Sequence, residues 1–164
     1  MISVFIDGDN CPALVLNYMA QYCTAGNLKL KVVANRKLNT KSAGYEMIVC
    51  EQTKDAADNY IFNSADKKSL VITKDTLLAE RLVNNNIVTI NDRGTIFDKD
   101  NIKYRIQDRN LNFQLASLGF GGKKEKNYTA ENLEKFKISL EKAMATLRRR
   151  DSWLKSAQRA PELS

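Results

Sequence analysis

The alternation of short apolar segments with stretches of helical spacing constrains the fold of this chain more than any other feature. Strands are predicted over residues 2–6, 28–34, 46–50, 70–73 and 87–90, with helices over 13–22, 55–65 and 76–83 between them. Strands that alternate with helices are typical of a parallel sheet covered on both faces. We therefore predict an α/β fold, three-layer α/β/α, with a central, mainly parallel five-stranded sheet.

The chain beyond residue 100 departs from this alternation. Two further helices are predicted, over 101–118 and 129–147, with a glycine- and lysine-rich loop between them. We expect both helices to pack on the α/β unit and complete one domain over residues 1–147. Residues 148–164 are then expected to be a basic helix end and a frayed tail.

The 164-residue chain contains no histidine, which excludes several kinds of catalysis. The chain can form no serine–histidine or cysteine–histidine nucleophile pair and no His-ligated zinc site. Catalysis would have to use carboxylates, lysines, hydroxyls or a metal held by oxygen, and oxygen ligands suit Mg²⁺ or Mn²⁺.

The net charge of +7 is unevenly distributed. Residues 116–164 carry 11 Lys or Arg and six Asp or Glu, a net charge of +5. A basic C-terminal part suits an anionic partner, and nucleic acid is the leading candidate. The sequence predicts no secretion leader and no membrane span, and its three cysteines lack a Cys-x-x-Cys spacing, so we expect a cytoplasmic protein with reduced thiols.

Acidic residues recur where the predicted strands end. Asp7 and Asp9 follow the first strand, Asp75 follows the fourth, and Asp55 and Asp58 open a predicted helix. Because parallel strands end at a common edge, we expect these five candidate catalytic residues to meet in one crevice. A metal bound there would polarise a phosphate and lower the pKa of a bound water, which is the chemistry of phosphodiester hydrolysis.

Other interpretations of these residues remain open. Asp55 and Asp58 also favour a helix N-terminus electrostatically, and Asp75 could simply cap the following helix. Further residues are candidates for contact with a substrate: Asn10, Lys74, Arg93, Lys123 and Lys124. The two lysines follow Gly121 and Gly122, which would allow a close approach to a nucleic-acid backbone.

Several motifs keep the order and spacing of a known family. They are FIDGDNCP (5–12), VAN (33–35), DAADNYI (55–61), LVITKDTLLA (70–79) and NDRG (91–94). The chain resembles the YaiI/YqxD family, a bacterial group with a PIN-like fold allied to NYN and FEN-type nucleases. The resemblance implies that Asp7, Asp58 and Asp75 bind the metal, with Asp9 and Asp55 beside them.

Two departures from the family pattern carry information. Gly8 and Asn10 stand where the family often has alanine, and the resulting Asp-Gly-Asp-Asn looks like the first motif of NYN-type nucleases. Gln107-Asp108-Arg109 falls near an Arg-Asp pair of the family, but in a permuted order.

Three functions are compatible with these residues. The first is a metal-dependent nuclease of PIN-like type that uses Mg²⁺ or Mn²⁺ and acts on RNA in preference to DNA. The second is a non-catalytic RNA-binding module on the same scaffold. The third, an aspartyl-phosphate phosphatase with Asp7 as nucleophile, fits less well, because no late paired acidic motif is present. A homodimer through a sheet edge or the long helix is also compatible with the sequence.

Overall fold

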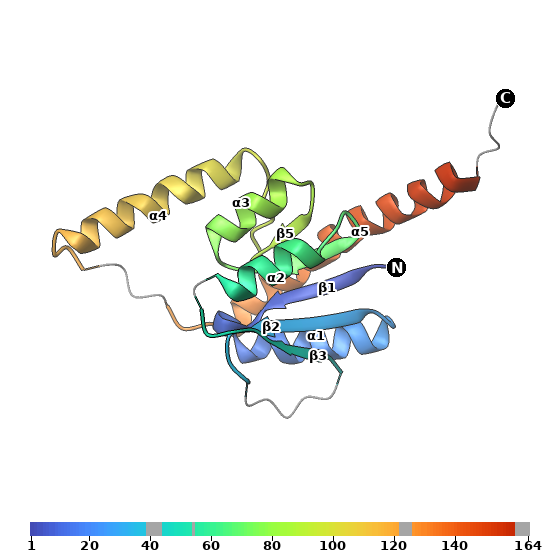
Figure 1. The fold of residues 1–164 in the computed structure, drawn as a ribbon, viewed down its shortest axis with the longest axis horizontal. Helices are drawn as coiled ribbons and strands as arrows, with labels where there is room; N and C mark the ends of the chain where they lie inside the picture. The colour runs from blue at the N-terminus through green and yellow to red at the C-terminus, as the bar shows by residue number, and fades with distance from the viewer. Residues whose placement is uncertain (39–43, 54, 122–125, 160–164) are drawn as a thin grey trace.

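Five parallel strands form the central layer of the molecule (Figure 1). The computed structural model describes residues 1–38, 44–53, 55–121 and 126–159. The strands are β1 (Ser3–Asp7), β2 (Lys29–Ala34), β3 (Glu46–Val49), β4 (Ser69–Ile72) and β5 (Val88–Ile90). Their order in the sheet is β3-β2-β1-β4-β5, so β1 lies between β2 and β4.

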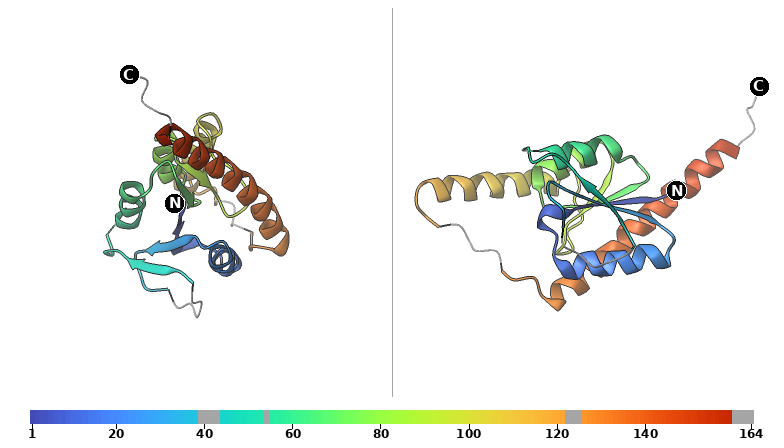
Figure 2. Two further views of the ribbon diagram at one scale, coloured as in Figure 1. Left: turned by 90° about the vertical axis from the view of Figure 1, so that its right-hand side faces the viewer. Right: turned by 60° about the horizontal axis from the view of Figure 1, so that its bottom comes forward.

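Helices cover both faces of this sheet (Figure 2). The first four helices are α1 (Ala13–Ala25), α2 (Ala56–Ser64), α3 (Thr76–Asn84) and α4 (Asn101–Ser117), and α5 (Ala130–Arg159) is the last. Successive side chains of a strand point to opposite faces. On β1, Val4 and Ile6 pack with α1 and α5, whereas Phe5 packs with α2 and α3. The α/β fold class is therefore confirmed, and the sheet is entirely parallel.

The two C-terminal helices differ in how they contact the body. Phe136, Leu140 and Met144 of α5 are fully buried in the core. In α4 the buried residue is Ile102, which packs with Ala79 and Val83 of α3. Beyond this contact α4 extends away from the sheet (Figure 1).

The last helix is longer than predicted. It continues through 148–159, so residues 156–159, expected to fray, are helical in the structure. Residues 160–164 lie outside the described part of the chain. None of the helices among the described residues is both long and apolar enough to span a membrane.

Candidate functional site

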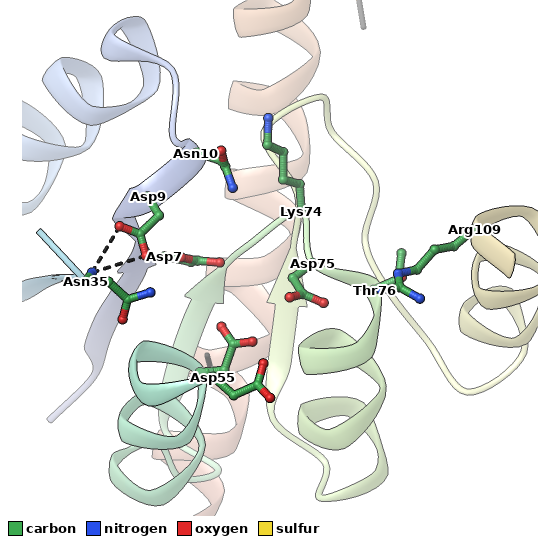
Figure 3. A pocket seen from close by; sticks show the side chains of 10 residues that line it. Asp7, Asp9, Asn10, Asn35, Asp55, Lys74, Asp75, Thr76 and Arg109 are labelled. Atoms are coloured by element: carbon green, nitrogen blue, oxygen red, sulfur yellow. Dashed lines mark hydrogen bonds between the residues drawn. The ribbon is translucent and has the colours of Figure 1, made fainter. Parts of the chain in front are cut away.

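A polar cavity of about 620 Å³ opens at the carboxyl ends of the central strands. Figure 3 shows Asp7 and Asp75 directing their carboxylates into the same space. The cavity is lined by Asp7, Asp9, Asn10, Asn35, Asp55, Asp58, Lys74, Asp75, Thr76 and Arg109. Clefts of this size are typical of ligand sites, and this one lies where open α/β sheets bind their ligands.

The hydroxyl of Thr73 links two of the acids. Thr73 follows β4 and is buried, and its Oγ1 donates to Oδ2 of Asp7 at 3.0 Å. The same oxygen accepts a hydrogen bond from the backbone N–H of Asp75 at 3.1 Å. Parallel pairing of β1 with β4 brings these residues together although they are far apart in sequence. One hydroxyl therefore fixes the relative positions of the ends of both strands.

Asp75 also caps α3. Its Oδ1 accepts hydrogen bonds from the N–H groups of Leu77 and Leu78 at 2.9 and 3.3 Å. This is the capping interaction expected of an aspartate before a helix. The capping bonds occupy Oδ1, and the carboxylate still lines the cavity, so capping and a role in the site are compatible.

Asp9 is held by the end of the neighbouring strand. A short 3₁₀ turn over Gly8–Asn10 carries Asp9 toward β2. There both carboxylate oxygens accept from the backbone N–H of Asn35, at 3.0 and 3.2 Å (Figure 3). Gly8 allows this close approach, because a Cβ at its position would lie 2.8 Å from Val32 Cγ1.

Asp55 and Asp58 reach the cavity from the start of α2. Asp55 precedes the helix with a left-handed backbone, φ 69°, and its side chain makes no capping hydrogen bond. A non-glycine residue in this conformation costs about 1–3 kcal/mol, and such strain concentrates at functional sites. A favourable charge at the helix N-terminus does not by itself account for the left-handed backbone of Asp55.

The carboxylates destabilise one another's charged forms. Burial raises the pKa of Asp7, and the charges of Asp9 and Asp75 add to this, although the Thr73 hydrogen bond opposes it. Burial raises the pKa of Asp58 to about 7, helped by the charges of Asp75 and Asp7 and by a hydrogen bond with the Asp75 carboxyl group. Burial and mutual repulsion therefore favour the protonated forms of Asp7 and Asp58 in the cavity.

Two polar atoms in the cavity wall lack hydrogen-bond partners. Among the described residues, Asn35 Oδ1 and Thr76 Oγ1 are buried and unpaired. Buried polar atoms are nearly always paired, so each requires an explanation, and a bound ligand or water is one. No group of three or more Asp, Glu, Cys or His side chains in the described part of the chain is arranged to hold a metal as it lies.

The structure brings together seven of the predicted site residues: Asp7, Asp9, Asn10, Asp55, Asp58, Lys74 and Asp75. Arg93 is not among the lining residues. Its guanidinium donates to Lys126 O at 2.6 Å and to Asn132 Oδ1 at 3.3 Å, and so ties the turn after β5 to the start of α5. Lys123 and Lys124 lie outside the described residues.

Three lining residues were not predicted to be in the site: Asn35, Thr76 and Arg109. Asn35 directly follows β2, so the strand-end argument used for the aspartates would have found it. Thr76 follows Asp75 and could have been found in the same way. Arg109 comes from the middle of α4, and the signal that could have found it is its place near the family's Arg-Asp pair, in a permuted order.

Comparison with known proteins agrees with the motifs. The family model described as "Uncharacterized BCR, YaiI/YqxD family" matches residues 5–146. A UPF0178 protein of Treponema denticola is 34% identical over 146 residues, covering 88% of this chain and 92% of the relative. A UPF0178 protein of Trichlorobacter lovleyi is 30% identical over 149 residues, covering 90% of this chain and 97% of the relative.

Comparison with the solved structures gives no match. The family match covers most of the chain, including the end of β1 with Asp7, the start of α2, and β4 with Asp75 after it. The chain therefore belongs to the YaiI/YqxD family.

Proposed function

We propose that this protein is a metal-dependent nuclease that hydrolyses phosphodiester bonds, with RNA as the favoured substrate and Mg²⁺ or Mn²⁺ as the cofactor. The observation that carries this proposal is the convergence of five aspartates on one cavity that is also lined by Lys74 and Arg109. Carboxylates supply ligands for a hard cation, and cationic side chains suit a phosphate backbone.

The chemistry of the donor set fits a divalent cation. Asp7, Asp58 and Asp75 would hold it. The raised pKa values of Asp7 and Asp58 come first from burial and then from repulsion by neighbouring carboxylates, and a bound cation would offset both. When bound, the cation would supply Lewis-acid polarisation of a phosphate and a water of lowered pKa. Because the side chains do not converge on one point as they lie, binding would require them to rotate.

The remaining lining residues would orient the attacking water and bind the substrate. Asp9, fixed by the Asn35 backbone, would accept a hydrogen bond from the attacking water. Asn10 and Asn35 would position water or substrate with their amides, and the unpaired Asn35 Oδ1 is an acceptor that such a water would satisfy. Lys74 would favour the phosphate electrostatically.

The test combines metal binding with cleavage. Manganese titrations by calorimetry would compare wild type with Asp7→Asn and Asp75→Asn, and a labelled single-stranded RNA would report cleavage. Asparagine still caps a helix, so Asp75→Asn should leave α3 intact. We expect both variants to lose manganese binding and at least about 100-fold in cleavage rate.

The matched control is Asp100→Asn, which removes an exposed carboxylate that makes no capping hydrogen bond. It should bind manganese and cleave as wild type does. Wild type that neither binds manganese nor cleaves would overturn the proposal.

One observation favours a second function, a non-catalytic RNA-binding module. Among the described residues, the acids do not form a preassembled metal site. A scaffold that only binds RNA would not need one. This function predicts that RNA binding persists unchanged in Asp7→Asn and in EDTA, and an RNA-binding measurement on the same variants distinguishes the two.

A further inference from the structure

One face of α4 continues directly from the core to the cavity rim and beyond. Residues three and four apart lie on the same side of a helix. By that spacing Ile102, Ile106, Arg109, Phe113 and Ala116 form one stripe, here called the inner stripe. Ile102 and Ile106 pack with α3, and Arg109 lines the acidic cavity. Phe113 comes one turn later and is 73% exposed.

Arg109 lines the acidic cavity from the side of α4. Figure 3 shows its side chain reaching from α4 toward Thr76 at the start of α3. No hydrogen bond or ion pair joins Arg109 to another residue in the described ranges, and Thr76 Oγ1 is also unpaired there. An exposed guanidinium at the edge of a cavity can hold a phosphate group through parallel N–H donors.

Phe113 adds an aromatic surface next to this guanidinium. Phe113 lies four positions after Arg109, which corresponds to a rise of about 6 Å along the helix. Aromatic side chains beside cationic ones are the usual platform for unpaired bases, because every base has a face that stacks. Bases of a duplex are already stacked and are not accessible in this way.

The composition of α4 favours a polyanion over a second protein copy on this stripe. The helix carries three basic residues and one acidic residue, Lys103, Arg105, Arg109 and Asp108. By helix spacing, the neighbours of Phe113 on α4 are Arg109, Asn110, Ala116 and Ser117, which add little apolar area. The wider apolar surface, with Tyr104, Leu111 and Leu115, lies on the opposite side of the helix by spacing.

We propose that the inner stripe of α4 is a binding surface for single-stranded nucleic acid, with a phosphate held by Arg109 at the cavity edge and the adjacent base stacked on Phe113. This inference rests on the proposed function, because a nucleic-acid strand bound to the inner stripe would run into the same cavity. It makes α4 the element that selects unpaired over paired strands.

The experiment measures binding of labelled single-stranded and duplex RNA by fluorescence anisotropy in EDTA, where no metal-dependent cleavage occurs. Phe113→Ala should weaken single-strand binding roughly tenfold and leave duplex binding nearly unchanged. Arg109→Ala should weaken single-strand binding and lower the slope of log affinity against log salt by about one. Arg109→Lys keeps the charge but loses the planar guanidinium, so it should bind single-stranded RNA better than Arg109→Ala but more weakly than wild type.

The matched control is Tyr104→Ala, which removes an aromatic side chain of similar exposure, 70%, from the other side of the same helix. It should bind RNA as wild type does. Equal effects of Phe113→Ala and Tyr104→Ala would overturn the inference. So would a Phe113→Ala variant that binds RNA normally but converts a dimer to a monomer in sedimentation, because a second copy would then cover the stripe.

The outcomes separate this inference from the proposed function. A selective loss in Phe113→Ala, with no cleavage by wild type, would retain the binding surface and reject the nuclease. Cleavage that depends on Asp7 but is indifferent to Phe113 and Arg109 would retain the nuclease and reject this surface.

Discussion

At the scale of single residues, the cavity shows a conflict between stability and site chemistry. Asp58 and Asp7 are forced together with other carboxylates although burial and mutual repulsion raise their pKa values. Crowded carboxylates lower the stability of the protein without ligand, and groups with such shifted pKa values are typical of functional sites.

Replacing Asp58 tests this conflict. Its folded-state pKa of about 7 lies above the ordinary 3.8, so its stabilising contribution is complete below about pH 3.8 and is lost as pH rises through about 7. In EDTA, Asp58→Asn should therefore be more stable than wild type at pH 8 by about 1–2 kcal/mol, allowing for screening of a half-exposed group. At pH 5 most of the difference should vanish. Urea unfolding at both pH values measures it.

Asp100→Asn is the control for the loss of one negative charge, and it should show no such pH dependence. A variant Asp58→Asn that is less stable than wild type at pH 8 would mean that the carboxylate has a stabilising partner in the fold.

At the scale of elements, one turn fixes α5 against the sheet. Gly94 follows β5 with φ +92°, and its carbonyl accepts a hydrogen bond from Ser139 Oγ of α5 at 2.5 Å. A Cβ at Gly94 would lie 2.8 Å from Lys135 O and 2.9 Å from Lys135 C, both in the backbone of α5. The absence of a side chain here allows the helix to pack closely.

We expect Gly94→Ala to lower the free energy of unfolding by about 2–4 kcal/mol, because a backbone clash is added to the strain of a positive φ. Gly119→Ala is the matched control, since Gly119 also has a positive φ, +84°, but its Cβ would meet none of the described residues within 4 Å. It should cost only about 1–2 kcal/mol. Thermal or urea unfolding gives the comparison, and equal losses would show that the contact with α5 is not tight.

At the scale of the whole molecule, α5 joins distant parts of the fold. Its N-terminal end packs beside the turn after β5, and its middle fills the core with Phe136 and Leu140. Farther along, Arg150 donates to Asn86 O at 2.7 Å and to Lys67 O at 3.4 Å, in the turns that precede β5 and β4. One helix therefore contacts the turns at both ends of β5 and the turn before β4.

Arg150→Met tests this bridge away from the cavity. The variant keeps the aliphatic stem but leaves two carbonyls without their donor, so stability should fall by about 1–2 kcal/mol. Arg149→Met removes an equal charge from a side chain that bonds only within α5, to Thr146 at 3.3 Å, and should be nearly neutral. Urea unfolding measures both. Similar stabilities for the two variants would show that the bridge contributes nothing to the fold.

The sequence by itself determined the fold class and most of the site. Alternating apolar and helical segments are local patterns, and they predicted every strand to within about two residues. The five aspartates could be placed in one cavity without a structure, because parallel strands end at the same edge and α2 begins there. The same argument, applied to Asn35 and Thr76, would have added both.

Only the tertiary structure decided which residues from other elements complete the cavity. Arg93 follows a strand, yet its guanidinium turns to α5 because acceptors at Asn132 and Lys126 lie within reach. Arg109 enters the cavity because Ile102 and Ile106 dock α4 on α3, a contact between segments that local periodicity does not specify. Long-range packing sets the direction of a helix, and that direction sets where its side chains end.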